Sequence, residues 1–380
     1  MKDKLGNHIQ QIRGVSYKPS DLSETLMDGY TTLLRANNIV DGKINLDSVQ
    51  YVKKDRVSQM QILNTNDILV CSSSGSLSSI GKSAIYKKSG EHTFGAFCKV
   101  IRTTGKLYSN YLALYLRSPF YRHHIEKVAN GANINNLRNE DLDEIILEIP
   151  TEAKQHAIIS NMEKLQSIIE SRRIQLRKLD ELVKCRFVEM FGDPVQNNHN
   201  WDRYPISKIA PIAGASKPDS DPVWLLNLDM VRAQTGEIIS YKYLSPDKIG
   251  ASTCFFDKQN VLYSKLRPYL NKVVLPDRAG CATSELVPLR PLAMLNRLFL
   301  AHLLRSDYFV AFISDKVTGA KMPRVSMDAF KNFECICPPI DIQNAFATFV
   351  QQLDKSRFAI QRSLEETQKL FDSLMQEYFS

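Results

Sequence analysis

The residues from Gly75 to Ser83 read GSLSSIGKS and come close to a phosphate-binding loop. Such a loop needs four residues between its two glycines, followed by Lys-Ser or Lys-Thr at the start of a helix. Here five residues separate Gly75 from Gly81, and Ala84 to Tyr86 are typical of a strand. The spacing therefore argues against nucleotide binding through Lys82.

Other residue types that support catalysis do not form a recognisable pattern. The seven cysteines are scattered without a C-x-x-C pair, and Cys335 and Cys337 have no paired histidines nearby, which favours buried thiols in a reducing compartment. His123 and His124 lie in a helix-like stretch, and no dinucleotide, zinc-protease or serine-hydrolase motif occurs. The CPPI stretch at Cys337 lacks the polar lead and the aromatic residue of an amino-methyltransferase motif. We therefore expect no catalytic residue, no metal and no cofactor bound by this chain.

The chain contains one long internal repeat. LRSPFYRHHIEKVANGANINNL begins at Leu116, and LRSDYFVAFISDKVTGAKMPRV begins at Leu304, at an offset of 188 residues. The same offset relates Gly131 to Gly319 and Gln155 to Gln343, whereas the match fades upstream, where NDILVCSSSGS at Asn66 corresponds to QNVLYSKLRPY at Gln259. Fixed self-similarity over this length indicates a duplicated domain with its connector. A shared frame with one divergent region fits a protein that does the same task twice on two different targets.

Each copy ends in a long amphipathic segment. Residues 151–191 contain no Gly or Pro between Thr151 and Phe191, and residues 339–380 repeat the pattern. Apolar residues follow the four-three spacing of a coiled-coil seam, interrupted by Arg172 in the first copy and by Arg357 and Thr367 in the second. The predicted seam residues are Ile158, Met162, Leu165, Ile169, Leu176, Leu179, Val183, Phe346, Val350, Leu353, Ile360, Leu364, Phe371 and Leu374. Two ordinary helices lying on their own domains would give a similar pattern, but the unbroken length favours two long helices that pair.

The two remaining segments are predicted to be globular domains. Residues 1–150 and 192–338 alternate strand-like runs with turns and helix-like runs, which indicates mixed α/β domains with largely antiparallel sheet. We therefore expect an α+β fold: two similar domains separated by two long antiparallel coiled-coil helices and related by a pseudo-twofold. Residues 1–150 carry 19 basic and 15 acidic side chains, and residues 192–338 carry 18 and 14. The positive surplus in both domains hints at a polyanionic partner. The N-terminal sequence has no apolar signal core and no long apolar run occurs, so we expect a cytoplasmic protein.

The ordered set of motifs resembles the specificity (S) subunits of type I restriction–modification systems. The resemblance covers essentially the whole chain, and it rests on the order of the motifs together with the duplication and the two long helices. The matching stretches are LLRANNI at Leu33, NDILVCSSSGSLSSIGKSAIY at Asn66, TFGAFCKVIR at Thr93, GANINNL at Gly131, MFGDP at Met190, SKLRPYLNK at Ser264 and ATSELVPLRP at Ala282.

The resemblance implies two target-recognition domains, each of which recognises one half of a bipartite, asymmetric double-stranded DNA site. It implies that the paired helices act as a spacer and dock two modification (M) subunits, which carry S-adenosylmethionine and methylate adenine. Restriction (R) subunits would add cleavage driven by ATP and Mg²⁺, although a methylation-only system without them stays open. The family also places a Gly-Ala/Thr-Asn-Ile type turn near the docked M subunits, which implies a partner-binding role for Gly131, Ala132, Asn133 and Ile134 and for Gly319 and Ala320. The second turn departs from the pattern because it continues as Lys321-Met322-Pro323.

Candidate DNA contacts follow from residue type. Arg, Lys, Asn and Gln hydrogen-bond base edges, whereas Ser and backbone N–H groups serve phosphates. The candidates in the first domain are Arg35, Asn37, Asn38, Ser72, Ser73, Ser74 and Lys82, and those in the second are Asn227, Lys265, Arg267, Tyr269 and Asn271. Arg267 is the foremost of these because KLRPY replaces a serine-rich loop in the divergent region.

Two other classes of protein fit the same sequence features. A stand-alone regulator with two DNA-binding domains would bind specific DNA stably without an M subunit. A coiled-coil scaffold between protein partners would lack the steep salt dependence that neutralising several phosphates imposes on DNA binding.

Overall fold

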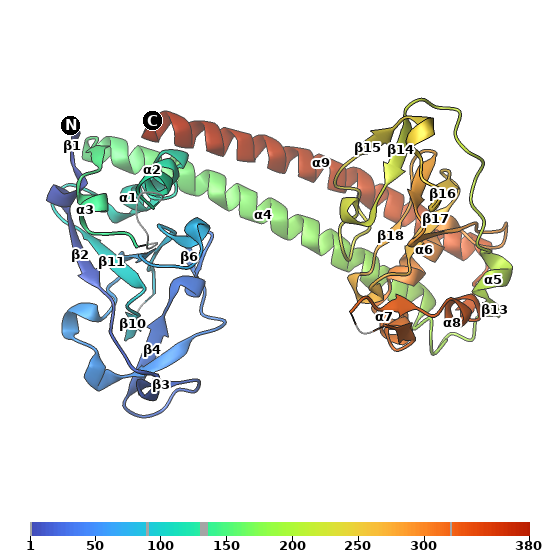
Figure 1. The fold of residues 1–380 in the computed structure, drawn as a ribbon, viewed down its shortest axis with the longest axis horizontal. Coiled ribbons are helices and arrows are strands. Elements are labelled where there is room, and N and C mark those ends of the chain that lie inside the picture. Colours follow the sequence, from blue (N-terminus) through green and yellow to red (C-terminus); the bar gives the residue numbers. More distant parts are fainter. Residues whose placement is uncertain (1, 89–90, 130–135, 320) are drawn as a thin grey trace. The chain divides into compact units, whose positions relative to one another are not determined.

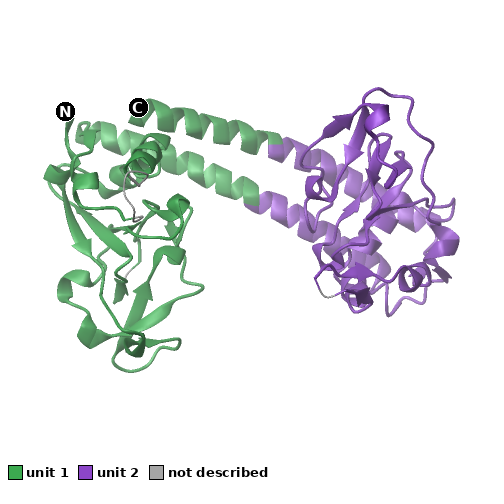
Figure 2. Ribbon diagram, viewed as in Figure 1, with its two compact units in different colours: residues 1–173, 362–380 green, residues 174–361 purple. Residues whose placement is uncertain are grey.

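The computed structural model describes residues 2–88, 91–129, 136–319 and 321–380 (Figure 1). The chain divides into two compact units, residues 1–173 with 362–380 and residues 174–361 (Figure 2). Unit 1 and unit 2 therefore each contain one globular portion and a part of both long helices, α4 (Glu152–Phe191) and α9 (Ile340–Phe379).

The described part of unit 1 includes two four-stranded sheets, the two-stranded pairs β1-β12 and β5-β6, and the short helices α1, α2 and α3. One sheet has the order β2-β11-β8-β9 and is antiparallel throughout, and the other has the order β10-β4-β7-β3 and contains one parallel pair, β10 with β4. The elements are β1 (Lys2–Lys4), β2 (Ile9–Arg13), β3 (Leu22–Ser23), β4 (Tyr30–Leu34), β5 (Ile39–Val40), β6 (Lys43–Ile44), β7 (Gln50–Lys53), β8 (Ile68–Cys71), β9 (Ser83–Ile85), β10 (His92–Phe94), β11 (Cys98–Thr103), α1 (Ser109–Tyr115), α2 (Pro119–Ala129), α3 (Glu140–Asp143) and β12 (Ile146–Glu148).

In its described residues, unit 2 repeats this plan with one four-stranded and one three-stranded sheet. Its sheets have the orders β15-β14-β19-β16 and β18-β17-β20, and β14 with β19 is again a parallel pair. The elements are β13 (Arg203–Pro205), α5 (Ile206–Ile209), β14 (Val223–Leu226), β15 (Lys242–Leu244), β16 (Thr253–Phe256), β17 (Val261–Ser264), β18 (Val273–Val274), β19 (Gly280–Thr283), β20 (Leu286–Leu289), α6 (Arg297–Arg305), α7 (Asp307–Ser314), β21 (Val317–Thr318), β22 (Arg324–Val325), α8 (Met327–Lys331) and β23 (Glu334–Ile336).

The central strands, β8 in unit 1 and β17 in unit 2, are buried on both faces. This burial explains why their sequences are apolar without interruption. In β8, Ile68 and Val70 pack into the cluster that contains α1, α2 and the long helices, whereas Leu69 and Cys71 pack toward the second sheet. Strand β17 alternates in the same way, with Val261 and Tyr263 on the helical side and Leu262 on the other. Since side chains alternate along a strand, each central sheet lies between helices and a second sheet.

The two long helices pack antiparallel within each unit. In unit 1, Ile158 and Met162 near the start of α4 share a core with Met375 and Phe379 at the end of α9. In unit 2, Phe187 and Phe191 at the end of α4 pack around Phe346 near the start of α9, with ring centroids 5.6 and 5.4 Å from it. All the predicted seam residues are buried or half-buried. The prediction of an α+β fold with two paired antiparallel helices is confirmed.

The polar residues that interrupt the seam also have partners. Arg357, in α9, makes a 2.6 Å ion pair with Asp180 in α4, within unit 2. Such a cross-helix ion pair favours one register of the helix pair over its neighbours.

A buried glutamine joins each long helix to its globular portion. The Gln155 side chain accepts a hydrogen bond from the Tyr108 N–H at 3.0 Å and donates to the carbonyls of Lys106 and Pro150 at 2.9 and 3.0 Å. The Gln343 side chain accepts from the Asn296 N–H at 2.8 Å and donates to the carbonyls of Met294 and Pro338 at 3.1 and 2.6 Å. Every partner is shifted by the same 188 residues, so the sequence repeat is a repeat of hydrogen bonds as well.

Candidate DNA-recognition surfaces

In each unit, a 3-10 turn follows the strand of the parallel pair that comes first in the sequence, β4 in unit 1 and β14 in unit 2. In unit 1, β4 leads into a turn at Ala36–Asn38, and in unit 2, β14 leads into a turn at Leu228–Met230. The residue that precedes each turn is Arg35 in unit 1 and Asn227 in unit 2. Two residues predicted separately as DNA contacts therefore occupy equivalent positions.

The loop after each central strand is held by the same backbone hydrogen bonds. The Ser72 N–H donates to the Phe97 carbonyl at 2.9 Å, and the Lys265 N–H donates to the Glu285 carbonyl at 3.0 Å. On the other side of the loop, the Leu137 N–H donates to the Ser72 carbonyl and the Val325 N–H to the Lys265 carbonyl, both at 2.8 Å. The backbone frame is thus common to both units, whereas the side chains that it carries differ.

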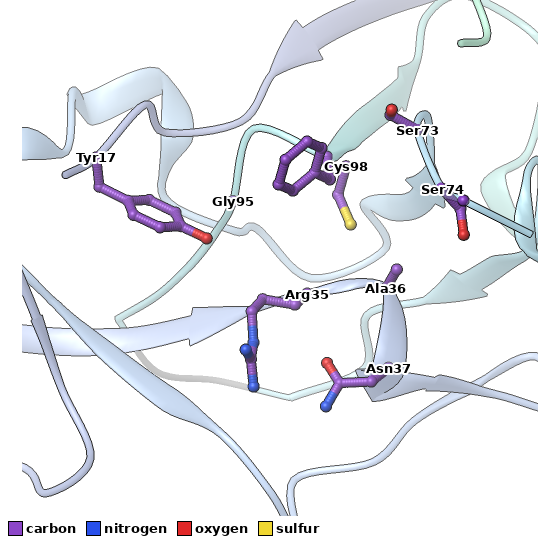
Figure 3. A pocket seen from close by; sticks show the side chains of 10 residues that line it. Tyr17, Arg35, Ala36, Asn37, Ser73, Ser74, Gly95 and Cys98 are labelled. Atoms are coloured by element: carbon purple, nitrogen blue, oxygen red, sulfur yellow. The ribbon is translucent and has the colours of Figure 1, made fainter. Parts of the chain in front are cut away.

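In unit 1 the turn and the loop surround a pocket of about 410 Å³ (Figure 3). Arg35 and Asn37 come from the turn, and Ser73 and Ser74 come from the loop after β8. The remaining lining residues are Tyr17, Ala36, Gly75, Gly95, Phe97 and Cys98. The fold therefore brings together two pairs of predicted contacts, Arg35 with Asn37 and Ser73 with Ser74, that lie more than thirty residues apart in the sequence.

The chemistry of this pocket suits a ligand that offers hydrogen-bond acceptors and apolar surface. The Nε atom of Arg35 is buried and has no hydrogen-bond partner among the residues that the structure describes. Phe97 is an exposed aromatic residue, with 62% of its surface accessible. Burial raises the pKa of the Cys98 thiol to about 12, so this group is neutral and is not a nucleophile at physiological pH.

In unit 2 the corresponding loop exposes Arg267 and Tyr269, and Lys265 and Asn227 are half-buried. Arg267 has a left-handed backbone conformation with φ of +50°, and its N–H donates to the Pro323 carbonyl at 2.8 Å. This contact joins the loop to the hairpin formed by β21 and β22. The guanidinium of Arg267 thus sits on a loop that is anchored through its backbone.

Three predicted contacts are used by the fold instead. The buried Asn38 amide donates to the carbonyls of Asn45 and Ser48, both at 2.9 Å, and its oxygen accepts from the Arg35 N–H. Asn271 is also buried, with φ of +49°, and donates to the Arg305 carbonyl at 2.9 Å. Ser72 is buried beneath the loop. These side chains are not free to reach a base, so we correct their assignment to turn formation and packing.

Lys82 is exposed in the turn before β9, and no helix follows it as a phosphate-binding loop would need. The predicted partner-binding residues Gly131, Ala132, Asn133, Ile134 and Ala320 lie outside the described residues. Gly319 is exposed, has φ of +92° and directly follows β21. Within the described ranges, no three His, Cys, Asp or Glu side chains gather closely enough to hold a metal ion, and no helix is long and apolar enough to cross a membrane.

Sequence reasoning missed Tyr17, Phe97, Glu285 and Arg324. Glu285 accepts hydrogen bonds from the Arg324 guanidinium, and this pairing raises the pKa of Arg324. The 188-residue offset aligns Phe97 with Glu285, in a region where the sequence match between the two copies has faded. Chemically unlike residues at one position of a shared frame are expected where two units recognise different ligands.

The duplicated frame, the paired helices and the divergent surface loops define an α+β protein with two similar units joined by paired helices. A family model for the type I restriction modification DNA specificity domain matches residues 11–178. The specificity subunits of the type I restriction enzymes StySPI from Salmonella potsdam and EcoKI from Escherichia coli K12 are each 36% identical over 173 residues. These alignments cover 46% of this chain and 37% of each relative. The chain thus matches little more than a third of the length of those relatives.

The fold comparison covers the whole chain. The crystal structure of a type I restriction-modification system S subunit from M. genitalium aligns with 100% of this chain and 96% of its own, with a TM-score of 0.61 and 14% identity. At this identity the similarity shows a shared fold. Together, the comparisons confirm the resemblance to type I specificity subunits that the sequence motifs indicated.

Proposed function

We propose that this chain is the DNA sequence-specificity subunit of a type I restriction–modification complex and recognises a bipartite, asymmetric DNA site. The observation that carries the proposal is the shared backbone frame with different side chains, half-buried Arg35 and exposed Phe97 in unit 1 against half-buried Asn227 and Glu285 in unit 2. A common frame keeps the mode of DNA docking the same, and different side chains select different bases. Two unequal surfaces on one chain fit an asymmetric target.

The partners in this proposal are double-stranded DNA, two modification subunits and restriction subunits. Exposed apolar side chains on the long helices support docking of protein partners at equivalent places. Leu182 in α4 and Leu370 in α9 are 188 residues apart and are 46% and 51% exposed. The modification subunits would bring S-adenosylmethionine and methylate adenine, and the restriction subunits would bring ATP and Mg²⁺, while this chain supplies recognition.

The proposal predicts that methylation requires this chain and follows its specificity. The chain is produced together with a cognate modification subunit in a host without type I methylation, and adenine methylation is mapped across the genome. We expect methylation at an interrupted, asymmetric motif only when both proteins are present, and none with this chain alone.

Other outcomes of this experiment would contradict the proposal. Methylation at the same motif without this chain would assign recognition to the modification subunit. Stable sequence-specific DNA binding by the chain alone, with no methylation in either case, would favour a stand-alone regulator. DNA binding without a steep dependence on salt concentration would favour a scaffold between proteins, since contacts to several phosphates impose that dependence.

A further inference from the structure

The position occupied by Phe97 in unit 1 is occupied by Glu285 in unit 2. Both residues lie between the parallel strand and the next antiparallel strand, and both accept a backbone hydrogen bond from the first residue of the recognition loop. A second pair of positions faces this loop from the other side, because Ser73 forms an isolated bridge with Asn136 and Leu266 forms one with Arg324. Phe97 and Asn136 in unit 1 therefore correspond to Glu285 and Arg324 in unit 2.

In unit 2 these two side chains bind each other. The Nε atom of Arg324 donates to both carboxylate oxygens of Glu285 at 3.1 and 3.3 Å, and its Nη2 atom donates to Oε1 at 2.9 Å. Glu285 is the less exposed partner, with 21% of its side chain accessible against 44% for Arg324. The carboxylate thus holds one edge of a guanidinium that remains open to solvent.

The other edge of the guanidinium makes no hydrogen bond to any residue that the structure describes. Among the described residues, Nη1 of Arg324 makes no hydrogen bond, and Nη2 makes one, to Oε1 of Glu285, so one of its two N–H groups has no acceptor there. Two parallel N–H groups on one edge of an arginine match the O6 and N7 acceptors of guanine in the major groove. An exposed ion pair of this kind contributes little to stability.

We propose that Arg324 hydrogen-bonds a guanine in the half-site recognised by unit 2, and that Glu285 is the positioning residue that orients it. This inference rests on the proposed function and names a specificity-determining residue within it. Arg324 lies next to the loop that carries Arg267, whose N–H is bonded to the carbonyl of the adjacent Pro323. The recognition surface of unit 2 then consists of the β17 loop together with strand β22, which carries Arg324.

The test is DNA binding by the complex with modification subunits, after the methylated motif has been mapped. Duplexes carry each base pair of the second half-site changed in turn, and affinities are measured at low ionic strength so that phosphate contacts retain the complex. Wild type should lose on the order of 5- to 150-fold in affinity when the guanine is replaced. R324K keeps the positive charge but lacks the two parallel N–H donors of arginine. It should therefore bind the duplex in which the guanine is replaced and the cognate duplex with about equal affinity.

Glu285 is tested by E285Q, which removes the charge but keeps one acceptor oxygen. We expect E285Q to reduce discrimination at the same base pair by less than R324K does, and to leave the other base pairs unaffected. The matched control is Arg278→Lys, because Arg278 also pairs with a carboxylate, Asp277, at 2.8 Å, but precedes β19, whereas Glu285 follows that strand. Arg278→Lys should leave discrimination unchanged.

Full discrimination at every base pair of the second half-site by R324K would overturn the inference, and so would a change confined to the first half-site. Equal weakening on all duplexes would assign Arg324 to a phosphate contact and would also overturn it. These results differ from a failure of the proposed function, in which wild type itself would show no preference for the mapped motif.

Discussion

Replacing Gln343 with methionine should lower the free energy of unfolding by about 3–5 kcal/mol, and Gln155→Met should have a similar effect. Each glutamine is fully buried and makes three hydrogen bonds to backbone groups. Methionine fills a similar volume but leaves these N–H and carbonyl groups without their partner, at about 1–3 kcal/mol for each buried group. These hydrogen bonds join the start of a long helix to the globular portion of its unit. Their loss therefore also weakens the attachment of that globular portion, which carries the recognition surface, to the helix.

The measurement is chemical denaturation of the full chain followed by circular dichroism. The matched control is Gln352→Met, which makes the same change at an exposed position of α9 and should alter stability by less than about 0.5 kcal/mol. A loss of less than about 1 kcal/mol for both Gln343→Met and Gln155→Met would show that the repeated hydrogen bonds do not anchor the helices.

A matched insertion of four residues in both long helices should lengthen the unrecognised gap of the DNA site by about two base pairs. Four residues add roughly 6 Å of helix and rotate its continuation by only about 40°, and one base pair occupies about 3.4 Å. The insertions belong after Ser171 in α4 and after Gln361 in α9. These sites lie between the two sets of helix contacts, those of Met162 with Met375 and Phe379 in unit 1 and the Asp180–Arg357 ion pair in unit 2.

The comparison with a single insertion makes this prediction specific. An insertion after Ser171 alone cannot keep both sets of contacts in register, so it should either abolish methylation or leave the gap unaltered through slippage. Mapping of the methylated motif measures the gap directly. An active double-insertion variant with an unchanged gap would show that these helices do not set the spacing.

The long helices and the repeat could be predicted because their signals are local or periodic. The seam needs only apolar residues at four-three spacing, and the repeat needs only a constant offset, as in the correspondence of Gln155 with Gln343. The role of these two glutamines was not predictable, because burial of an amide and its partners some 47 residues away depend on the tertiary fold.

The recognition surfaces were predicted in part. The segments after β4 and β8 were identified from residue type, and the structure brings Arg35, Asn37, Ser73 and Ser74 around one pocket. Asn38 and Asn271 were assigned wrongly because asparagine suits both base recognition and tight turns, and only burial separates the two. Arg324 was missed because its partner Glu285 lies 39 residues earlier in the chain and meets it only through the hairpin beside the β17 loop.

The central claim is that each unit recognises its own half of one DNA site. It is tested most directly by replacing residues 1–150 with the equivalent domain of a related specificity subunit of known target and mapping the methylated motif of the resulting complex. The account predicts that the half-site contributed by the replaced domain changes to that of the donor, while the half-site recognised by unit 2 stays the same. A motif that changes in both halves, or in neither, would contradict it.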